Sequence, residues 1–190
     1  RTFHQPVYFP GNPVLAPDTP FERPEGRRPT AFVFSGGVWY DPAERLYKIW
    51  YHCPTGTCYA TSLNGVEWRK PELDFQPGAN LVHRAPMDSS TIWLDLAEKD
   101  PSRRYKYAFT GGHMRPLYLH FSPDGIHWGQ PVAQSRPVAD RTTIFFNPFR
   151  RVWVYSIRDH TPGEIGPDRM RKPGEHLRYR RYWEHADVIQ

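Results

Sequence analysis

The chain contains a seven-residue motif, Ser-x-Asn/Asp-Gly-x-x-Trp, that recurs after sixty positions. The first copy runs from Ser62 to Trp68 and the second from Ser122 to Trp128. Each copy follows a run of aromatic and β-branched residues. The Asn-Gly or Asp-Gly step is typical of a tight turn between strands, because glycine readily adopts a positive φ. Since internal repeats constrain a fold more strongly than local signals do, the motif predicts a chain of repeated β-meanders.

Alignment on the turn predicts three repeat units at about 30–75, 86–132 and 138–190, preceded by an extended segment at 1–29. The strands expected within them are residues 37–42, 45–51 and 59–62, then 90–95, 103–109 and 117–121, then 143–148, 150–156 and 176–183. In the third unit Asp187 takes the place of the turn Asn or Asp. We therefore expect a tryptophan next after Gln190, within a longer polypeptide.

Meanders of four short strands, repeated every fifty to sixty residues, indicate a β-propeller. The 21 prolines and 14 glycines argue against long helices, since proline in a helix costs about 3 kcal/mol. The predicted fold is all-β: one partial propeller domain, 1–190, with four-stranded antiparallel blades. Three blades do not normally close a ring. We expect the remainder from the same longer chain or from an assembly, with the segment at Asn12–Leu15 adding an outer strand.

The formal charge of +5 is compatible with an anionic partner. Much of it is local, because six basic residues lie among the last twenty-two: Arg169, Arg171, Lys172, Arg178, Arg180 and Arg181. No zinc finger, helix-turn-helix or RNA-binding signature is present, so no nucleic-acid partner is predicted. No stretch approaches the roughly 20 apolar residues that cross a bilayer, so no membrane partner is predicted either.

Cys53 and Cys58 flank Pro54-Thr55-Gly56-Thr57, which resembles a four-residue hairpin loop. Such a loop would place the sulfurs nearly opposite each other, so a disulfide and two reduced cysteines both remain open. A disulfide would favour a secreted or periplasmic location. No second ligand pair has the spacing of a zinc site, and no metal or other cofactor is predicted.

The segment Asn12-Pro13-Val14-Leu15 before Pro-Phe-Glu, the strand Gly-Gly-Val-Trp-Tyr-Asp-Pro and the repeated turns together resemble the five-bladed β-propeller glycosidases. That group includes invertases and levanases, arabinanases and xylosidases, and mannoside phosphorylases. The resemblance would cover about three of five blades. It implies acidic residues at the starts of the innermost strands, pointing into a funnel on the propeller axis.

Asp88 and Asp140 occupy equivalent positions of this kind, each seven residues before Asp95 or Asn147. Hydrolysis of a glycosidic bond needs two carboxyl groups, which these two would supply. Glu22, in a Pro-Phe-Glu context, is the favoured third acid, with Glu164 and Glu184 as alternatives. An aspartate that bonds turn amides is an equally good interpretation of Asp88 and Asp140.

Five further residues are candidates for substrate binding. Arg141 and Arg158 would bind carboxylate or hydroxyl groups, His113 would lie on an upper loop, and Trp39 and Trp93 would stack on a sugar ring. The shared register of Trp39 and Trp93 favours a core role for both over stacking.

The sequence therefore predicts a glycoside hydrolase-like protein that cleaves or transfers glycosidic bonds of an oligosaccharide or polysaccharide. A non-catalytic carbohydrate-binding or scaffold propeller is the alternative. It is favoured by Phe34, which stands where the first unit would need its acid. A propeller used only for protein contacts is a third hypothesis.

Overall fold

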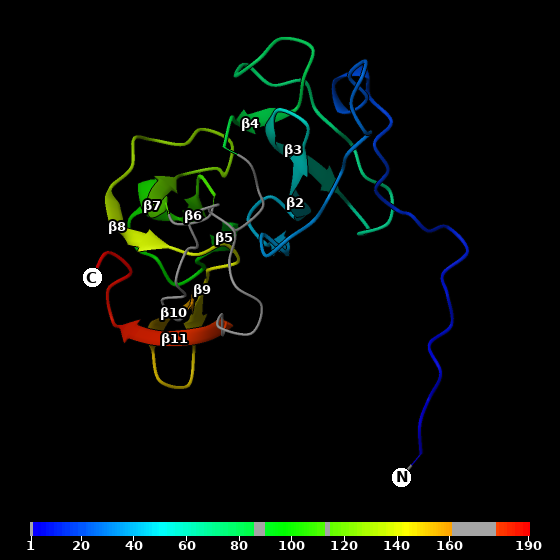
Figure 1. Cartoon of the computed structure of the whole chain (residues 1–190). Helices are drawn as coiled ribbons and strands as arrows, with labels where there is room; N and C mark the ends of the chain where they lie inside the picture. Colours follow the sequence, from blue (N-terminus) through cyan, green and yellow to red (C-terminus); the bar gives the residue numbers. More distant parts are fainter. Residues whose placement is uncertain (1, 86–89, 113–114, 161–177) are drawn as a thin grey trace, which may run out of the picture.

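A computed structural model describes residues 2–85, 90–112, 115–160 and 178–190. The chain is all-β, as predicted: three antiparallel sheets follow one another along the sequence (Figure 1). The first sheet contains β1 (Val38–Asp41), β2 (Leu46–Cys53), β3 (Gly56–Ser62) and β4 (Leu81–His83); the second contains β5 (Ser90–Leu94), β6 (Tyr105–Thr110), β7 (Arg115–Ser122) and β8 (Ala133–Val138); the third contains β9 (Thr143–Asn147), β10 (Val152–His160) and β11 (Arg178–His185). Two short 3-10 helices, η1 (Pro20–Glu22) and η2 (Pro101–Arg103), complete the described elements.

The fourth strands of the first two sheets lie beyond the predicted ends of the units, 75 and 132. β4 has three residues, and β8 has four consecutive exposed residues and contains Pro137. Neither shows the regular alternation of apolar and polar residues by which a strand is recognised in sequence. Edge strands of this kind are therefore the hardest strands to predict.

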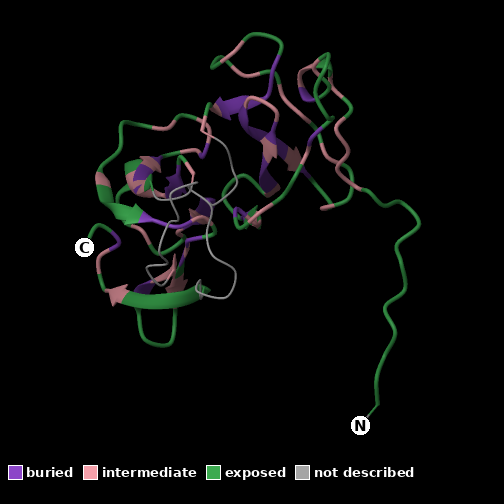
Figure 2. Cartoon of the chain, in the orientation of Figure 1, coloured by how far each residue is buried: buried purple, intermediate pink, exposed green. Residues whose placement is uncertain are grey.

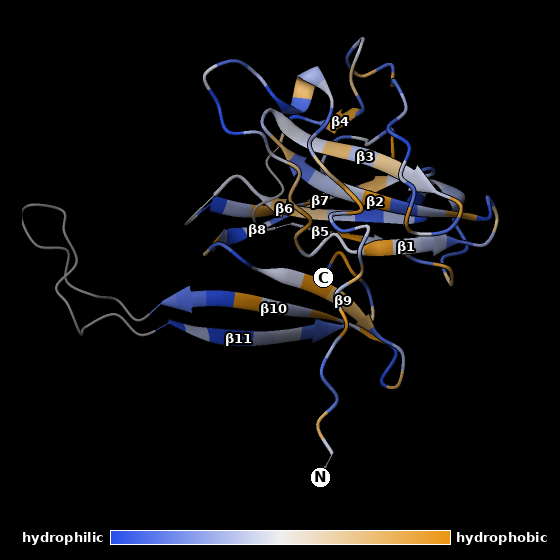
Figure 3. Cartoon of the chain, turned by 90° about the vertical axis from the view of Figure 1, so that its right-hand side faces the viewer, coloured by the Kyte–Doolittle hydropathy of each residue, from blue (hydrophilic) through white to orange (hydrophobic). Residues whose placement is uncertain are grey.

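The second sheet lies between the first and the third (Figure 3). β1 lies against β5, and β5 lies against β9, so the first strands of the three sheets run side by side. Aromatic residues dominate the core between the first two sheets, where Trp50, Tyr105 and Tyr107 are fully buried. In contrast, β11 is mostly exposed (Figure 2).

The three turns that follow the third strands share one hydrogen-bond pattern. In the second copy, Ser122 Oγ accepts from the Asp124 amide at 3.3 Å and Asp124 Oδ1 accepts from the Ile126 amide at 2.8 Å. In the third copy, His185 Nδ1 accepts from the Asp187 amide at 3.0 Å and Asp187 Oδ1 accepts from the Ile189 amide at 3.0 Å. Histidine thus replaces serine, and the aligned turn recurs in the third unit.

Cys53 and Cys58 form a disulfide and are not two reduced cysteines. The hairpin is tighter than predicted: Cys53 pairs with Gly56 and Cys58 pairs with Tyr51, so only Pro54 and Thr55 lie in the loop. No helix in the described part of the chain is long and apolar enough to cross a membrane.

Candidate functional site

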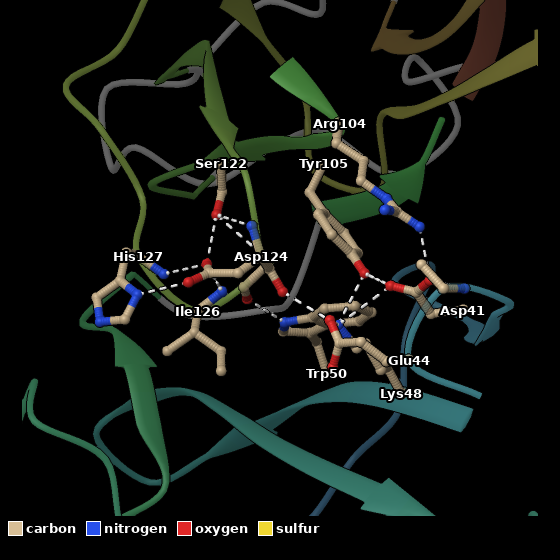
Figure 4. Close-up of polar contacts among 12 residues, drawn as sticks. Asp41, Glu44, Lys48, Trp50, Arg104, Tyr105, Ser122, Asp124, Ile126 and His127 are labelled. Carbon is tan, nitrogen blue, oxygen red and sulfur yellow. Dashed lines mark hydrogen bonds and ion pairs between the residues drawn. The ribbon is translucent and has the colours of Figure 1, made fainter. Parts of the chain in front are cut away.

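A buried polar cluster joins the first sheet to the second (Figure 4). The Asp41 carboxylate accepts from Tyr105 Oη at 2.5 Å and from Arg104 Nη2 at 2.6 Å, and lies 3.4 Å from Lys48 Nζ. Lys48 Nζ also donates to Glu44 Oε1 at 2.6 Å and to Tyr105 Oη at 2.9 Å. The Asp41 carboxylate, the Lys48 ammonium and the Tyr105 hydroxyl all bond to protein groups, so we interpret this cluster as a structural clamp.

The pKa values of the clamp agree with that interpretation. Burial alone would raise the pKa of Asp41, but the Tyr105 hydrogen bond, the Ala43 amide and the two cations lower it below its usual value. Burial, followed by the hydrogen bond to Asp41, raises the pKa of Tyr105. Asp41 is therefore held ionised and Tyr105 neutral, which suits an ion-pair anchor better than an acid or base near neutral pH.

A second polar group lies just before β1 and β9 and near the end of β10, and we call it the strand-start rim: Phe34, Asp140, Arg141 and Arg158. Arg158 Nη1 lies 2.8 Å from Asp140 Oδ1. The Arg141 guanidinium carbon lies 5.3 Å from the centre of the Phe34 ring. The rim thus gathers one carboxylate, two guanidinium groups and an aromatic ring, and it includes three of the residues predicted from the sequence.

The backbone holds the rim in place. Arg141 has a left-handed φ of 63°, which costs an L-residue about 1 kcal/mol. Its carbonyl accepts from Arg180 Nη1 at 2.6 Å. Beside it, Thr142 Oγ1 donates to the Ala139 carbonyl at 3.0 Å and accepts from the Arg158 amide at 3.2 Å. The turn that carries Asp140 and Arg141 is therefore fixed from both sides, as a binding surface requires.

Glu22 lies elsewhere, on the face of the first sheet that points away from the second. Its side chain is fully buried and accepts from Tyr51 Oη at 2.8 Å, Lys70 Nζ at 2.7 Å and the Thr19 amide at 3.0 Å. Thr19 and Glu22 also form a capping box around η1. Glu22 is thus used in anchoring the N-terminal segment, and it does not join the rim.

The predicted tryptophans pack between sheets. The Trp39 and Trp93 rings lie 4.7 Å apart, and Trp93 lies 5.8 Å from Trp153. Trp39 Nε1 donates to the Ile92 carbonyl at 2.9 Å. These contacts support the core interpretation of both residues. Asp88, His113 and Glu164 lie outside the described residues, and Glu184 bonds to Arg150 and Tyr182 on the exposed strand β11.

Sequence reasoning did not single out the buried lysines. Asp41 and Lys48 of the first unit recur as Asp95 and Lys106 of the second, and Lys106 Nζ lies 2.9 Å from Asp95. The pattern that could have identified them is a lysine at the same register of two otherwise apolar strands. Among the described residues, no group of three or more His, Cys, Asp or Glu side chains is placed to hold a metal ion.

No family model matches the chain, and no curated protein sequence matches it. Among solved structures, the chain is similar to an N-acetylgalactosamine deacetylase from F. plautii in complex with blood group B trisaccharide. It aligns with a TM-score of 0.54 at 16% identity, over 94% of this chain and 54% of that chain. The chain thus spans about half the length of that protein. At this identity, the likeness shows a shared fold and nothing about activity.

Proposed function

We propose that this chain is part of a carbohydrate-processing β-propeller that binds a glycan at the strand-start rim and cleaves or transfers its glycosidic bond there. The observation that carries the proposal is the contact between Arg141 and Phe34. Packed sheets lie about 10 Å apart, so the first and third sheets of a flat stack would be separated by about 20 Å. A contact between their strand starts supports blades that fan around a common axis.

The chemistry of the rim suits a sugar. Guanidinium groups donate several fixed hydrogen bonds to hydroxyl or carboxylate oxygens, and an aromatic ring packs against sugar C–H groups. Two arginines at one rim favour an anionic glycan. The similar structure was solved with a trisaccharide bound, which supports a carbohydrate ligand for this fold. Asp140 supplies one carboxylate for bond cleavage, and Asp88, its repeat equivalent, is proposed as the second.

A non-catalytic glycan-binding propeller is the second candidate. The ion pair between Asp140 and Arg158 favours it, because a carboxylate engaged by an arginine is well placed to fix the geometry of a binding surface. Phe34 favours it too, since an aromatic ring stands where the first repeat would need an acid.

The test uses the blood group B trisaccharide and a panel of neutral and uronic-acid oligosaccharides, scored for binding and for release of reducing sugar. Replacing Arg141 by Ala should weaken binding about tenfold or more, while Arg27→Ala, an exposed control, should not. Asp140→Asn should abolish release and leave the melting temperature nearly unchanged. Release that survives Asp140→Asn would overturn the catalytic role. Binding without release by the unaltered chain would support the second candidate, and binding unaffected by Arg141→Ala would remove the rim as the site.

A further inference from the structure

A cleft of about 1020 Å³ separates the second sheet from the third. Its walls include Leu117 and Leu119 of β7, Tyr155 and Ile157 of β10, and Trp183 of β11. The lining is mainly apolar, yet the cleft lies beside a packed core that contains Ala108, Ile144 and Trp153. Because the two sheets pack together elsewhere, we expect another group to fill this cleft.

The corresponding space between the first and second sheets is occupied. There Trp128, the last residue of the second turn motif, packs against the aromatic core, with its ring 5.2 Å from Tyr107. Ile126 of the same turn packs beside it. The first motif repeats this arrangement, because Trp68 packs on the outer face of the first sheet, in a cluster that includes Ile49.

The repeat register relates these positions to the cleft. Ile49, Tyr107 and Tyr155 stand at one position of the second strand in each sheet, as their pairings with Ala60, His120 and Trp183 show. Tyr155 therefore lines the cleft where Tyr107 supports Trp128. In the third turn, Ile189 stands where Ile126 does, and Ile189 and Gln190 both border the cleft.

We infer that the cleft is the seat of an indole ring carried by the residue next after Gln190. The aligned turn at Asp187 sets this position, because a residue four places after Asp124 enters the equivalent seat in the second repeat. The inference does not depend on the proposed function. It assigns the cleft to a segment of the same polypeptide and not to a small ligand.

The test compares two chains extended past Gln190, one by Trp-Gly-Ser and one by Ala-Gly-Ser. Burial of an indole should raise the melting temperature of the tryptophan chain by about 5 °C over the alanine chain. Leu119→Ala, within the cleft, should remove about half of that gain. Leu94→Ala, in the core between the first two sheets, should leave the gain unchanged, and Leu119→Val serves if Leu119→Ala fails to fold.

Equal melting temperatures of the two extended chains would overturn the inference. So would evidence for another occupant. If the two extended chains melted together, and deleting residues 2–10, which include the exposed Phe3, Val7 and Tyr8, lowered the melting temperature and produced a gain from the tryptophan, the N-terminal segment would be the occupant. A melting temperature that rises with protein concentration, together with a dimer in light scattering, would assign the cleft to a second copy.

Discussion

The interface between the first and second sheets is closed by large aromatic side chains, whereas the interface between the second and third sheets leaves a cleft. Trp50 donates from Nε1 to the Gly125 carbonyl at 2.7 Å in the first. At the equivalent places of the second interface stand Ala108 and Val188, both buried in its core. The first interface thus has a large residue and a glycine at these two positions, and the second has a small residue and a valine. Two interfaces of the same architecture are thus filled by side chains of different sizes at equivalent positions.

The polar clamps differ in the same way. In the first interface, the Lys48 ammonium donates a hydrogen bond to the Tyr105 hydroxyl. In the second, Lys106 lies 5.4 Å from the centre of the Trp153 ring, which occupies the register of Tyr105. In the third sheet, Asn147 stands at the aspartate position and Val154 at the lysine position, so both partners of the ion pair are replaced. A buried lysine is retained only where its carboxylate is retained.

The largest expected effect is at Asp41. Asp41→Asn would leave Lys48 and Arg104 without their shared buried carboxylate, and should lower the free energy of unfolding in urea by about 4 kcal/mol. Asp95→Asn is the matched change in the second interface. It should cost about 1 kcal/mol, because Asp95 is less buried than Asp41 and, unlike Asp41, does not also hold an arginine and a tyrosine hydroxyl in the described contacts. Equal losses would show that the two clamps are equivalent.

The next effect concerns Gly125, which has a φ of 80°. A Cβ there would lie 2.5 Å from Trp50 Cζ2, whereas a Cβ at Gly65, with a φ of 74°, would meet nothing within 4 Å. Gly125→Ala should therefore cost about 3 kcal/mol, against about 1 kcal/mol for Gly65→Ala, which carries only the backbone strain. Urea unfolding of both variants measures the difference. If Trp50→Leu relieves none of the larger loss, contact with Trp50 is not its cause.

Truncation of one leucine in each interface should have unequal effects. Leu94→Ala creates a cavity in a closed core and should cost about 3 kcal/mol, while Leu119→Ala enlarges a cleft that already exists and should cost about 1.5 kcal/mol. Both side chains are buried, with 3% and 5% of their surface exposed. Melting curves and urea unfolding at one protein concentration provide the comparison. A larger loss at Leu119 would contradict the open state of the second interface.

The smallest effect is a dependence on pH at the turn beside Gly125. Burial would raise the pKa of Asp124, but hydrogen bonds from the His127 side chain, from the amides of His127 and Ile126, and from Ser122 lower it to about 2. Because the pKa of Asp124 is lower in the folded than in the unfolded chain, its ionised carboxylate stabilises the fold. This contribution is complete above about pH 4 and is lost as the pH falls toward 2. The site is partly solvated, so we expect about 1 kcal/mol.

The first turn supplies the control for that prediction, because Asn64 already stands at the equivalent position. Asp124→Asn should flatten the loss of stability between pH 4 and 2, and at pH 7 it should cost about the same 1 kcal/mol, because the neutral amide lacks the stabilisation of the ionised carboxylate. The reverse change, Asn64→Asp, should add a similar slope. Unfolding in urea at a series of pH values measures both. An unchanged slope in Asp124→Asn would place the acid sensitivity at other carboxylates, such as Asp41.

Much of the fold could be predicted because its signals are local. The turn motif and the aromatic runs beside it are short-range patterns, and the structure confirms the all-β class and the place of the third turn. The fourth strands were harder, because β4 and β8 pair at sheet edges that impose little alternation. The buried anchoring role of Glu22 could not be predicted from local patterns, because its partners Tyr51 and Lys70 are twenty-nine and forty-eight positions away.

The candidate site could be predicted in part. The sequence predicts Asp140, Arg141 and Arg158 as site residues, and the structure brings them to one rim. The contact of Arg141 with Phe34 spans the first and third units, and no repeat pattern specifies it. Lys48 was overlooked because a lysine in a strand is usually exposed, and only the opposing Asp41 explains its burial.

Short-range patterns in the sequence predict the repeated turns, the strands that lead into them and the registers that align Asp88 with Asp140, since each depends on residues within a few positions of one another. Which faces of the sheets meet, and which of those faces close or leave a cleft, follows from packing between the sheets. That packing depends on volumes summed over residues far apart in the chain, and pairs such as Trp50 and Gly125 come together only when the sheets stack.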